Sequence, residues 1–137
     1  MHTKFKRNIG SLEEIYRCII AFIKQNDLDD AMLFTINLVI EELFVNMVKY
    51  NPDSSSDILI DLIKENIKIV ITLIDTNAEP FDITQFKTYD HTQSLEERPI
   101  GGVGIHLINK MMDKVDYEYK DGNSIITLTK YLEDKHV

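Results

Sequence analysis

Glu42 and Asn46 are two polar residues inside a segment that otherwise has the spacing of an amphipathic helix. Its apolar residues recur in steps of three and four, which keeps them on one helix face: Met32, Ile36, Val39, Leu43, Met47 and Tyr50. Asn46 falls inside that stripe, and Glu42 precedes it by one turn on the same side. A buried amide or carboxylate without a partner costs about 1 to 3 kcal/mol, so both groups need hydrogen-bonding or metal partners. When the segment is considered alone, it is explained equally well by a core amide whose hydrogen bonds are made and a carboxylate in contact with solvent.

Two further clusters have residue types that suit a nucleotide. Asp75 ends an apolar run and precedes Asn77 and Phe81, while Gly101-Gly102-Val103-Gly104 opens a helical pattern. A carboxylate at a strand end can accept the exocyclic amine of adenine, and the N–H groups at a helix N-terminus suit phosphates. A carboxamide can ligate Mg²⁺, and a neighbouring carboxylate can take a proton from an attacking hydroxyl. Each cluster alone is explained by turn formation, but together they indicate a nucleotide site.

Composition limits the alternatives. A length of 137 residues predicts a single domain over 1–137, and the 44% of residues that are hydrophobic can form its core. A net charge of −8 argues against nucleic acid as the main partner, because that role needs a surplus of Lys and Arg. Cys18 is the only cysteine, and no stretch approaches the roughly 18 apolar residues of a membrane span. We therefore expect a cytoplasmic protein without a membrane partner.

Periodicity and turn residues predict the elements that must position these clusters. In chain order they are a strand at 3–8, a helix from the N-cap Ser11 to about 26, a helix capped by Asp29 or Asp30 to about 50, strands at 58–63 and 67–74, a polar loop at 82–99, a helix at 101–112, and strands at 115–120 and 124–131. A polar loop of that length is typical of a lid. Because the strands come in hairpin pairs, we expect an α+β two-layer sandwich with a mixed, largely antiparallel sheet and the helices on one face.

Two common nucleotide signatures are missing from the chain. There is no G-x-x-x-x-G-K-[ST] loop, and no strand leads directly into the glycines with an acidic residue about 20 positions later. The expected nucleotide site is therefore of another kind.

The three clusters resemble the N, G1 and G2 boxes of the GHKL ATPases, whose domain is called the Bergerat fold. Glu42-Leu43-Phe44-Val45-Asn46 matches the E-x-x-x-N form of the N box, and the segment from Asp75 to Asp82 is similar to the D-x-G-x-P-F-D form of the G1 box. Gly102-Val103-Gly104-Ile105 matches the G2 box. The residues after the G2 box narrow the resemblance to the small bacterial anti-sigma factors that are also serine kinases.

The resemblance implies a role for each matched residue. Asn46 would coordinate a Mg²⁺ ion bound to ATP, Glu42 would be the general base, and Asp75 would bind the adenine amino group. Gly102 and Gly104 would let the helix approach the phosphates.

Further matches are looser. Lys49 and Arg98 would contact phosphate, and Thr127 matches a threonine near the adenine. In the G1 box, Asn77 replaces the usual glycine when the segment is aligned on Asp75, and Ala78 replaces it when the segment is aligned on Pro80-Phe81. The implied ATP-binding residues are therefore Asn46, Lys49, Asp75, Asn77, Phe81, Arg98, Gly101, Gly102, Val103, Gly104 and Thr127.

The function implied is that of an anti-sigma regulatory factor with ATP- and Mg²⁺-dependent serine/threonine kinase activity. It would phosphorylate a small antagonist protein, sequester a sigma factor, and form a homodimer through its first strand. Two alternatives stay open: a nucleotide-binding regulatory module without phosphoryl transfer, which the altered G1 box favours, and a stand-alone ATPase domain of the histidine-kinase type.

Overall fold

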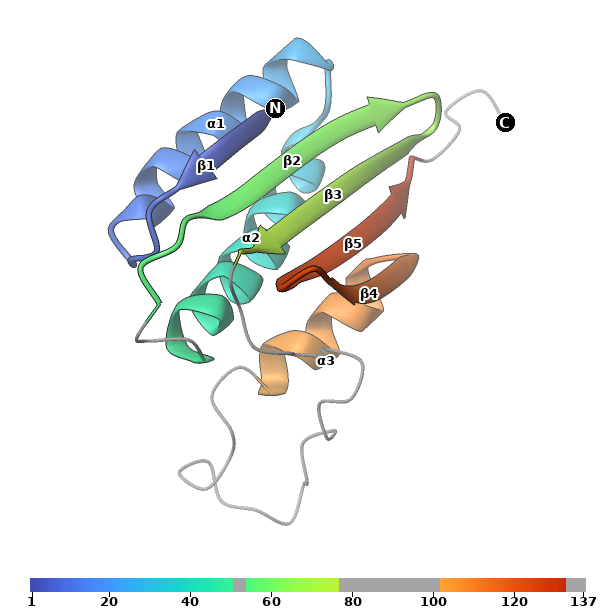
Figure 1. Cartoon of the computed structure of the whole chain (residues 1–137). Helices are drawn as coiled ribbons and strands as arrows, with labels where there is room; N and C mark the ends of the chain where they lie inside the picture. Colours follow the sequence, from blue (N-terminus) through green and yellow to red (C-terminus); the bar gives the residue numbers. More distant parts are fainter. Residues whose placement is uncertain (51–53, 77–101, 133–137) are drawn as a thin grey trace.

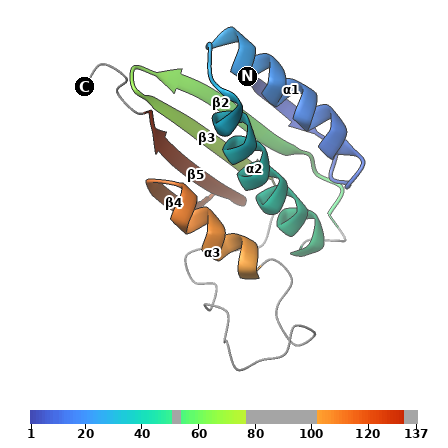
Figure 2. The ribbon, with the colours of Figure 1, turned by 180° about the vertical axis from the view of Figure 1, so that it is seen from behind.

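The structure is a computed structural model, and it describes residues 1–50, 54–76 and 102–132. These residues form two layers, a five-stranded sheet and three helices that all cover one of its faces (Figures 1 and 2). The elements are β1 (His2–Phe5), α1 (Ser11–Gln25), α2 (Asp30–Tyr50), β2 (Ile58–Glu65), β3 (Lys68–Asp75), α3 (Gly102–Met111), β4 (Lys114–Lys120) and β5 (Asn123–Tyr131). The two-layer α+β fold expected from the sequence is confirmed.

The sheet has the strand order β1-β2-β3-β5-β4, and each of these pairings is antiparallel. The β4–β5 hairpin turns at Asp121 and Gly122, which both have positive φ, at 54° and 81°. Two such residues suit the tight turns that match strand twist, so the hairpin expected at this dipeptide is confirmed.

The core lies between the sheet and the helices. Along β2, β3 and β5 every second side chain points to the helices, which is the period of a half-buried strand. Two of the resulting cross-strand rows are wholly apolar: Ile60, Leu73 and Ile126 form one, and Leu62, Ile71 and Leu128 the other. The next row is Ile58, Asp75 and Ser124, and all three are buried. Polar groups therefore replace apolar ones at this end of the core.

Helix α2 supplies the opposite wall of the core. Ile36, Val39, Leu43 and Met47 of the predicted stripe are 0 to 1% exposed, as an inward face requires. Residues Asp30–Lys49 have a mean hydropathy of 1.6, enough by length and composition alone for a membrane span. The expectation that no stretch reaches that level was wrong, but the apolar residues of α2 have a different use because they pack on the sheet and on α1.

The caps of the first two helices differ from each other. The Asp29 carboxylate accepts a hydrogen bond from the Met32 N–H at 2.9 Å, which confirms Asp29 as a cap of α2. Ser11 is the first residue of α1 and not its N-cap, which is Gly10. Ser11 is drawn inward because its hydroxyl donates to the Lys6 carbonyl at 2.8 Å and its N–H donates to the Asn8 carboxamide at 3.1 Å.

The first strand is shorter than expected, ending at Phe5 instead of about Asn8. After Phe5 the chain bends sharply, and the Asn8 N–H donates to the Lys6 carbonyl at 2.8 Å. This bend turns Arg7 toward the interior, where its side chain is only 3% exposed.

The cap of α2 gives a test of the fold. Asp29→Ala removes the acceptor of the Met32 N–H, so the free energy of unfolding should fall by about 1 kcal/mol. Asp30→Ala is the matched control, because Asp30 is exposed at the start of the same helix and should contribute only about 0.5 kcal/mol through the helix dipole. Urea denaturation followed by circular dichroism measures both, and equal effects would show that Asp29 is not the cap.

Candidate functional site

Three chain segments meet at one end of the molecule: the C-terminus of α2, the C-terminus of β3 and the N-terminus of α3 (Figures 1 and 2). Helix α2 packs against both β3 and α3. Asn46, Asp75 and Gly102 belong to these three segments, so the fold gathers at one end the three clusters that are separated in sequence. We call Asn46, Asp75 and Ser124, the buried polar residues here, the polar end of the core.

Asn46 is the least satisfied side chain of the polar end. It is 1% exposed, and neither its carboxamide oxygen nor its nitrogen has a hydrogen-bond partner among the described residues. Each such group costs about 1 to 3 kcal/mol, and native proteins carry few of them. The free oxygen fits a hard cation and the free NH₂ group fits an anionic oxygen, so the side chain suits a metal-bound phosphate.

Glu42 and Lys49 flank Asn46 on the same helix at spacings that put them on its side of α2. Glu42 is half-buried and Lys49 is exposed. The site therefore has a carboxylate that solvent or a substrate can reach, and a flexible cation at its rim.

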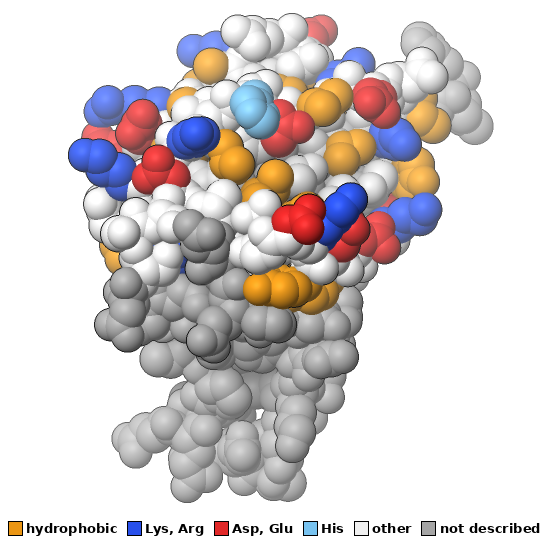
Figure 3. Space-filling view, viewed as in Figure 1, with side chains coloured by type: hydrophobic (Ala, Val, Ile, Leu, Met, Phe, Trp, Pro, Cys, Tyr) orange, Lys and Arg blue, Asp and Glu red, His pale blue; other side chains and the backbone are white. Residues whose placement is uncertain are grey.

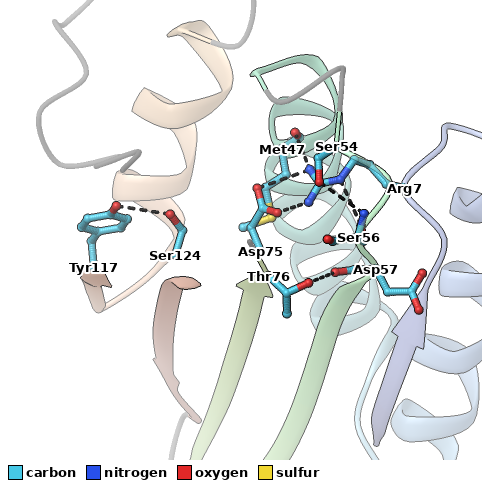
Figure 4. Close-up of polar contacts among 9 residues, drawn as sticks. All are labelled: Arg7, Met47, Ser54, Ser56, Asp57, Asp75, Thr76, Tyr117 and Ser124. Carbon is cyan, nitrogen blue, oxygen red and sulfur yellow. Dashed lines mark hydrogen bonds and ion pairs between the residues drawn. The ribbon is translucent and has the colours of Figure 1, made fainter. Parts of the chain in front are cut away.

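Asp75 has a partner that the sequence did not indicate, the guanidinium of Arg7 (Figure 4). One Arg7 Nη donates to each carboxylate oxygen of Asp75, and the two side chains are only 3% and 2% exposed. Arg7 also donates to the backbone carbonyl of Met47 at 3.0 Å and to that of Ser56 at 3.1 Å. No local pattern around Arg7 distinguishes it from its basic neighbours Lys4 and Lys6, because all of its partners are distant in sequence.

Ser124 lies beside Asp75 on β5, since the two residues are paired in the sheet register and both face the helices. The hydroxyls of Ser124 and Tyr117 are 3.3 Å apart (Figure 4). Ser124 is thus a hydroxyl group of the polar end that sequence reasoning missed. The feature that could have identified Ser124 is its position opposite Asp75 in the strand register.

The same register corrects the expectation that Thr127 lies near the adenine. It pairs with Thr72, which alternates away from the helices, so Thr127 lies on the opposite face of the sheet from Asp75. On that face, which no described helix covers, hydrophobic side chains lie among charged ones (Figure 3). Ser124 and Thr127 are three apart on β5, and residues at that spacing on a strand point to opposite faces. Thr127 is therefore not part of the polar end of the core.

Helix α3 begins at Gly102, as the sequence predicted for the glycine-rich turn. Its first turn contains no acidic residue, so nothing there opposes the positive end of the helix dipole. Val103 and Gly104 continue the helix. The backbone N–H groups of such a first turn have no partners within the helix and can bind an anion.

Four of the predicted site residues lie outside the described residues: Asn77, Phe81, Arg98 and Gly101. Within the described part of the chain, no three His, Cys, Asp or Glu side chains gather to hold a metal ion. The residues that are present fit a Mg²⁺ ion held jointly by one protein oxygen, phosphate oxygens and water, which is a common arrangement for this ion.

Comparison with known proteins shows the family of the domain. Residues 5–130 match the family model of the histidine kinase-like ATPase domain. The chain is 29% identical to the serine-protein kinase RsbW of Listeria monocytogenes, over 74% of this chain and 68% of that protein. It is 28% identical to the serine-protein kinase RsbW of Staphylococcus aureus, over 82% of this chain and 70% of that protein. The match to the family model spans nearly the whole described fold, so the chain belongs to the histidine kinase-like ATPase domain family.

Proposed function

We propose that this protein binds ATP with Mg²⁺ at the polar end of its core and transfers a phosphoryl group to a serine or threonine hydroxyl of a small antagonist protein. The observation that carries the proposal is the buried carboxamide of Asn46, which has no partner among the described residues. The similarity to serine-protein kinases supports the choice of acceptor.

The proposed roles follow from the position of each side chain. Asn46 would hold the Mg²⁺ ion through its oxygen, and Asp75 would accept the exocyclic amine of adenine. Glu42, half-buried one turn from Asn46, would take the proton of the acceptor hydroxyl. The N–H groups at the start of α3, with Lys49 at the rim, would bind phosphate oxygens. Bound ATP would supply the phosphoryl group and Mg²⁺ would neutralise its charge. The protein residues would therefore act mainly by positioning these groups.

The regulatory part of the proposal comes from the resemblance to anti-sigma kinases. We propose that the protein acts in the cytoplasm, sequesters a sigma factor in one state and engages the antagonist in the other. A homodimer is part of the same proposal. β1 is an edge strand of the sheet within the described chain, so it can offer backbone groups to a second copy.

A second candidate function is nucleotide binding without phosphoryl transfer. Asn77 at the position of the G1-box glycine favours it, because a side chain there limits how closely the backbone approaches a base. An ATPase domain that serves a separate histidine phosphoacceptor is the third candidate, to which Lys49 in the N box points. The residue that becomes labelled separates all three.

Replacing Asn46 tests the site without any partner protein. Asn46→Ala should raise the free energy of unfolding by about 1 kcal/mol or more relative to Asn37→Ala, because it removes an unpartnered buried amide. Asn37 is a half-buried asparagine of the same helix and corrects for helix propensity. Mg·ADP at about 100 times its Kd should raise the free energy of unfolding of the wild type by about 2.7 kcal/mol and leave that of Asn46→Ala unchanged. Urea denaturation measures both values. A variant that Mg·ADP still stabilises would exclude Asn46 from the site.

Replacing Glu42 separates binding from transfer. Glu42→Ala should bind Mg·ATP with nearly the wild-type Kd but lose transfer by about 100-fold or more, since it removes only the proton acceptor. Glu41→Ala, the exposed neighbour, is the matched control and should retain both. Calorimetry measures the Kd, and incorporation of γ-³²P into the antagonist measures transfer. Full transfer by Glu42→Ala would contradict the general-base role.

The acceptor can be identified by affinity capture from a lysate of the source cells, followed by labelling with γ-³²P-ATP. We expect a captured small protein to become labelled on serine or threonine, with acid-stable phosphate. Acid-labile label would favour the histidine-kinase type. Nucleotide binding with no label on any captured protein would favour the module without transfer.

A further inference from the structure

Arg7 lies in the bend between β1 and α1, far in sequence from every motif of the proposed site, yet its guanidinium is almost wholly buried. Four of its donor positions are used: Nε–H donates to Ser56, one Nη donates to Met47 and to Asp75, and the other Nη donates to Asp75. A planar fork of five donors can serve these four acceptor atoms on three residues at once, and a lysine ammonium with three donors cannot.

The contact with Met47 joins Arg7 to the helix that carries Asn46. The carbonyl of Met47 is one of the last four of α2, which have no N–H partner within the helix. A cation at this end also complements the helix dipole. Met47 directly follows Asn46, so Arg7 links the backbone beside Asn46 to the carboxylate of Asp75 through a single rigid group.

Arg7 approaches Asp75 from the side of β2. Arg7 is held by Ser56, just before β2, whereas Ser124 belongs to β5, and β2 and β5 pair with opposite edges of β3. Figure 4 shows Arg7 and Ser124 on either side of Asp75. The guanidinium therefore lies on the side of Asp75 away from β5.

We propose that Arg7 is a positioning residue of the nucleotide site. It holds the Asp75 carboxylate in one orientation and fixes that carboxylate relative to Asn46. The end of the site that recognises the base and the end that holds the phosphates are thereby joined by one side chain. This inference rests on the proposed function, and it extends the site to a residue outside all three motifs.

The test compares two triphosphates that differ only in the exocyclic amine, ATP and purine riboside 5′-triphosphate. In the wild type, ATP should bind roughly tenfold more tightly, since it alone donates to Asp75. Arg7→Lys keeps the charge but loses the fork, so this ratio should fall toward one while the Kd of the purine riboside triphosphate changes little. Arg17→Lys is the matched control, because Arg17 pairs with Glu13 on the exposed surface of α1, and it should keep the tenfold ratio.

The outcomes separate this inference from the proposed function. If the wild type binds neither triphosphate, the proposed function fails and the inference fails with it. If the wild type binds both equally, or if folded Arg7→Lys keeps the tenfold ratio, the role of Arg7 is overturned while nucleotide binding stands.

A second measurement decides the question if Arg7→Lys does not fold. The Arg7 Nε–H resonance of the wild type is followed by NMR with and without Mg·ATP. Slow solvent exchange in both states is expected if Arg7 stays on Asp75 while the nucleotide is bound. Loss of that protection on binding would show that Arg7 leaves the site, which overturns the proposal.

Discussion

The buried carboxamide of Asn46 is the constraint on which the account of this protein depends. An apolar residue at its place on α2 would continue the stripe of Ile36, Leu43 and Met47 and would cost nothing in unmade hydrogen bonds. Proteins break such local rules chiefly at functional sites. The neighbouring row of the sheet carries Asp75 and Ser124, where the two rows beyond it are apolar, so the buried polar groups gather at one end of the core.

The ion pair of Arg7 and Asp75 shows how the fold supports this polar end. Two charges can be buried when they pair closely and their other donors and acceptors are satisfied, and removing one partner typically costs about 3 to 5 kcal/mol. Arg7 meets this condition by bonding to carbonyls at the end of α2 and before β2 as well as to Asp75. The N-terminal bend therefore supports the polar end of the core, although it carries none of the motifs.

The sequence predicted the features that depend on a local residue pattern. It did not predict the features that depend on pairing between distant segments. The helical period of the α2 segment correctly predicted that Asn46 is buried, and the dipeptide Asp121-Gly122 correctly predicted the β4–β5 hairpin. Both features depend on residues that are close together in the sequence. The error over Thr127 arose because the face of a strand residue depends on register, and a shift of one position exchanges the faces.

Arg7 could not be found from the sequence. Its carboxylate partner is 68 residues away, and only the folded chain brings the two together.

The most direct test of the account is an NMR titration of the Asn46 side-chain amide with Mg·ADP. If the polar end of the core is a nucleotide site, the two N–H resonances of this carboxamide should shift saturably and exchange more slowly with solvent as the nucleotide binds. Saturable binding of Mg·ADP that leaves these two resonances unchanged would contradict the account, because the unpartnered amide would then have no role in binding.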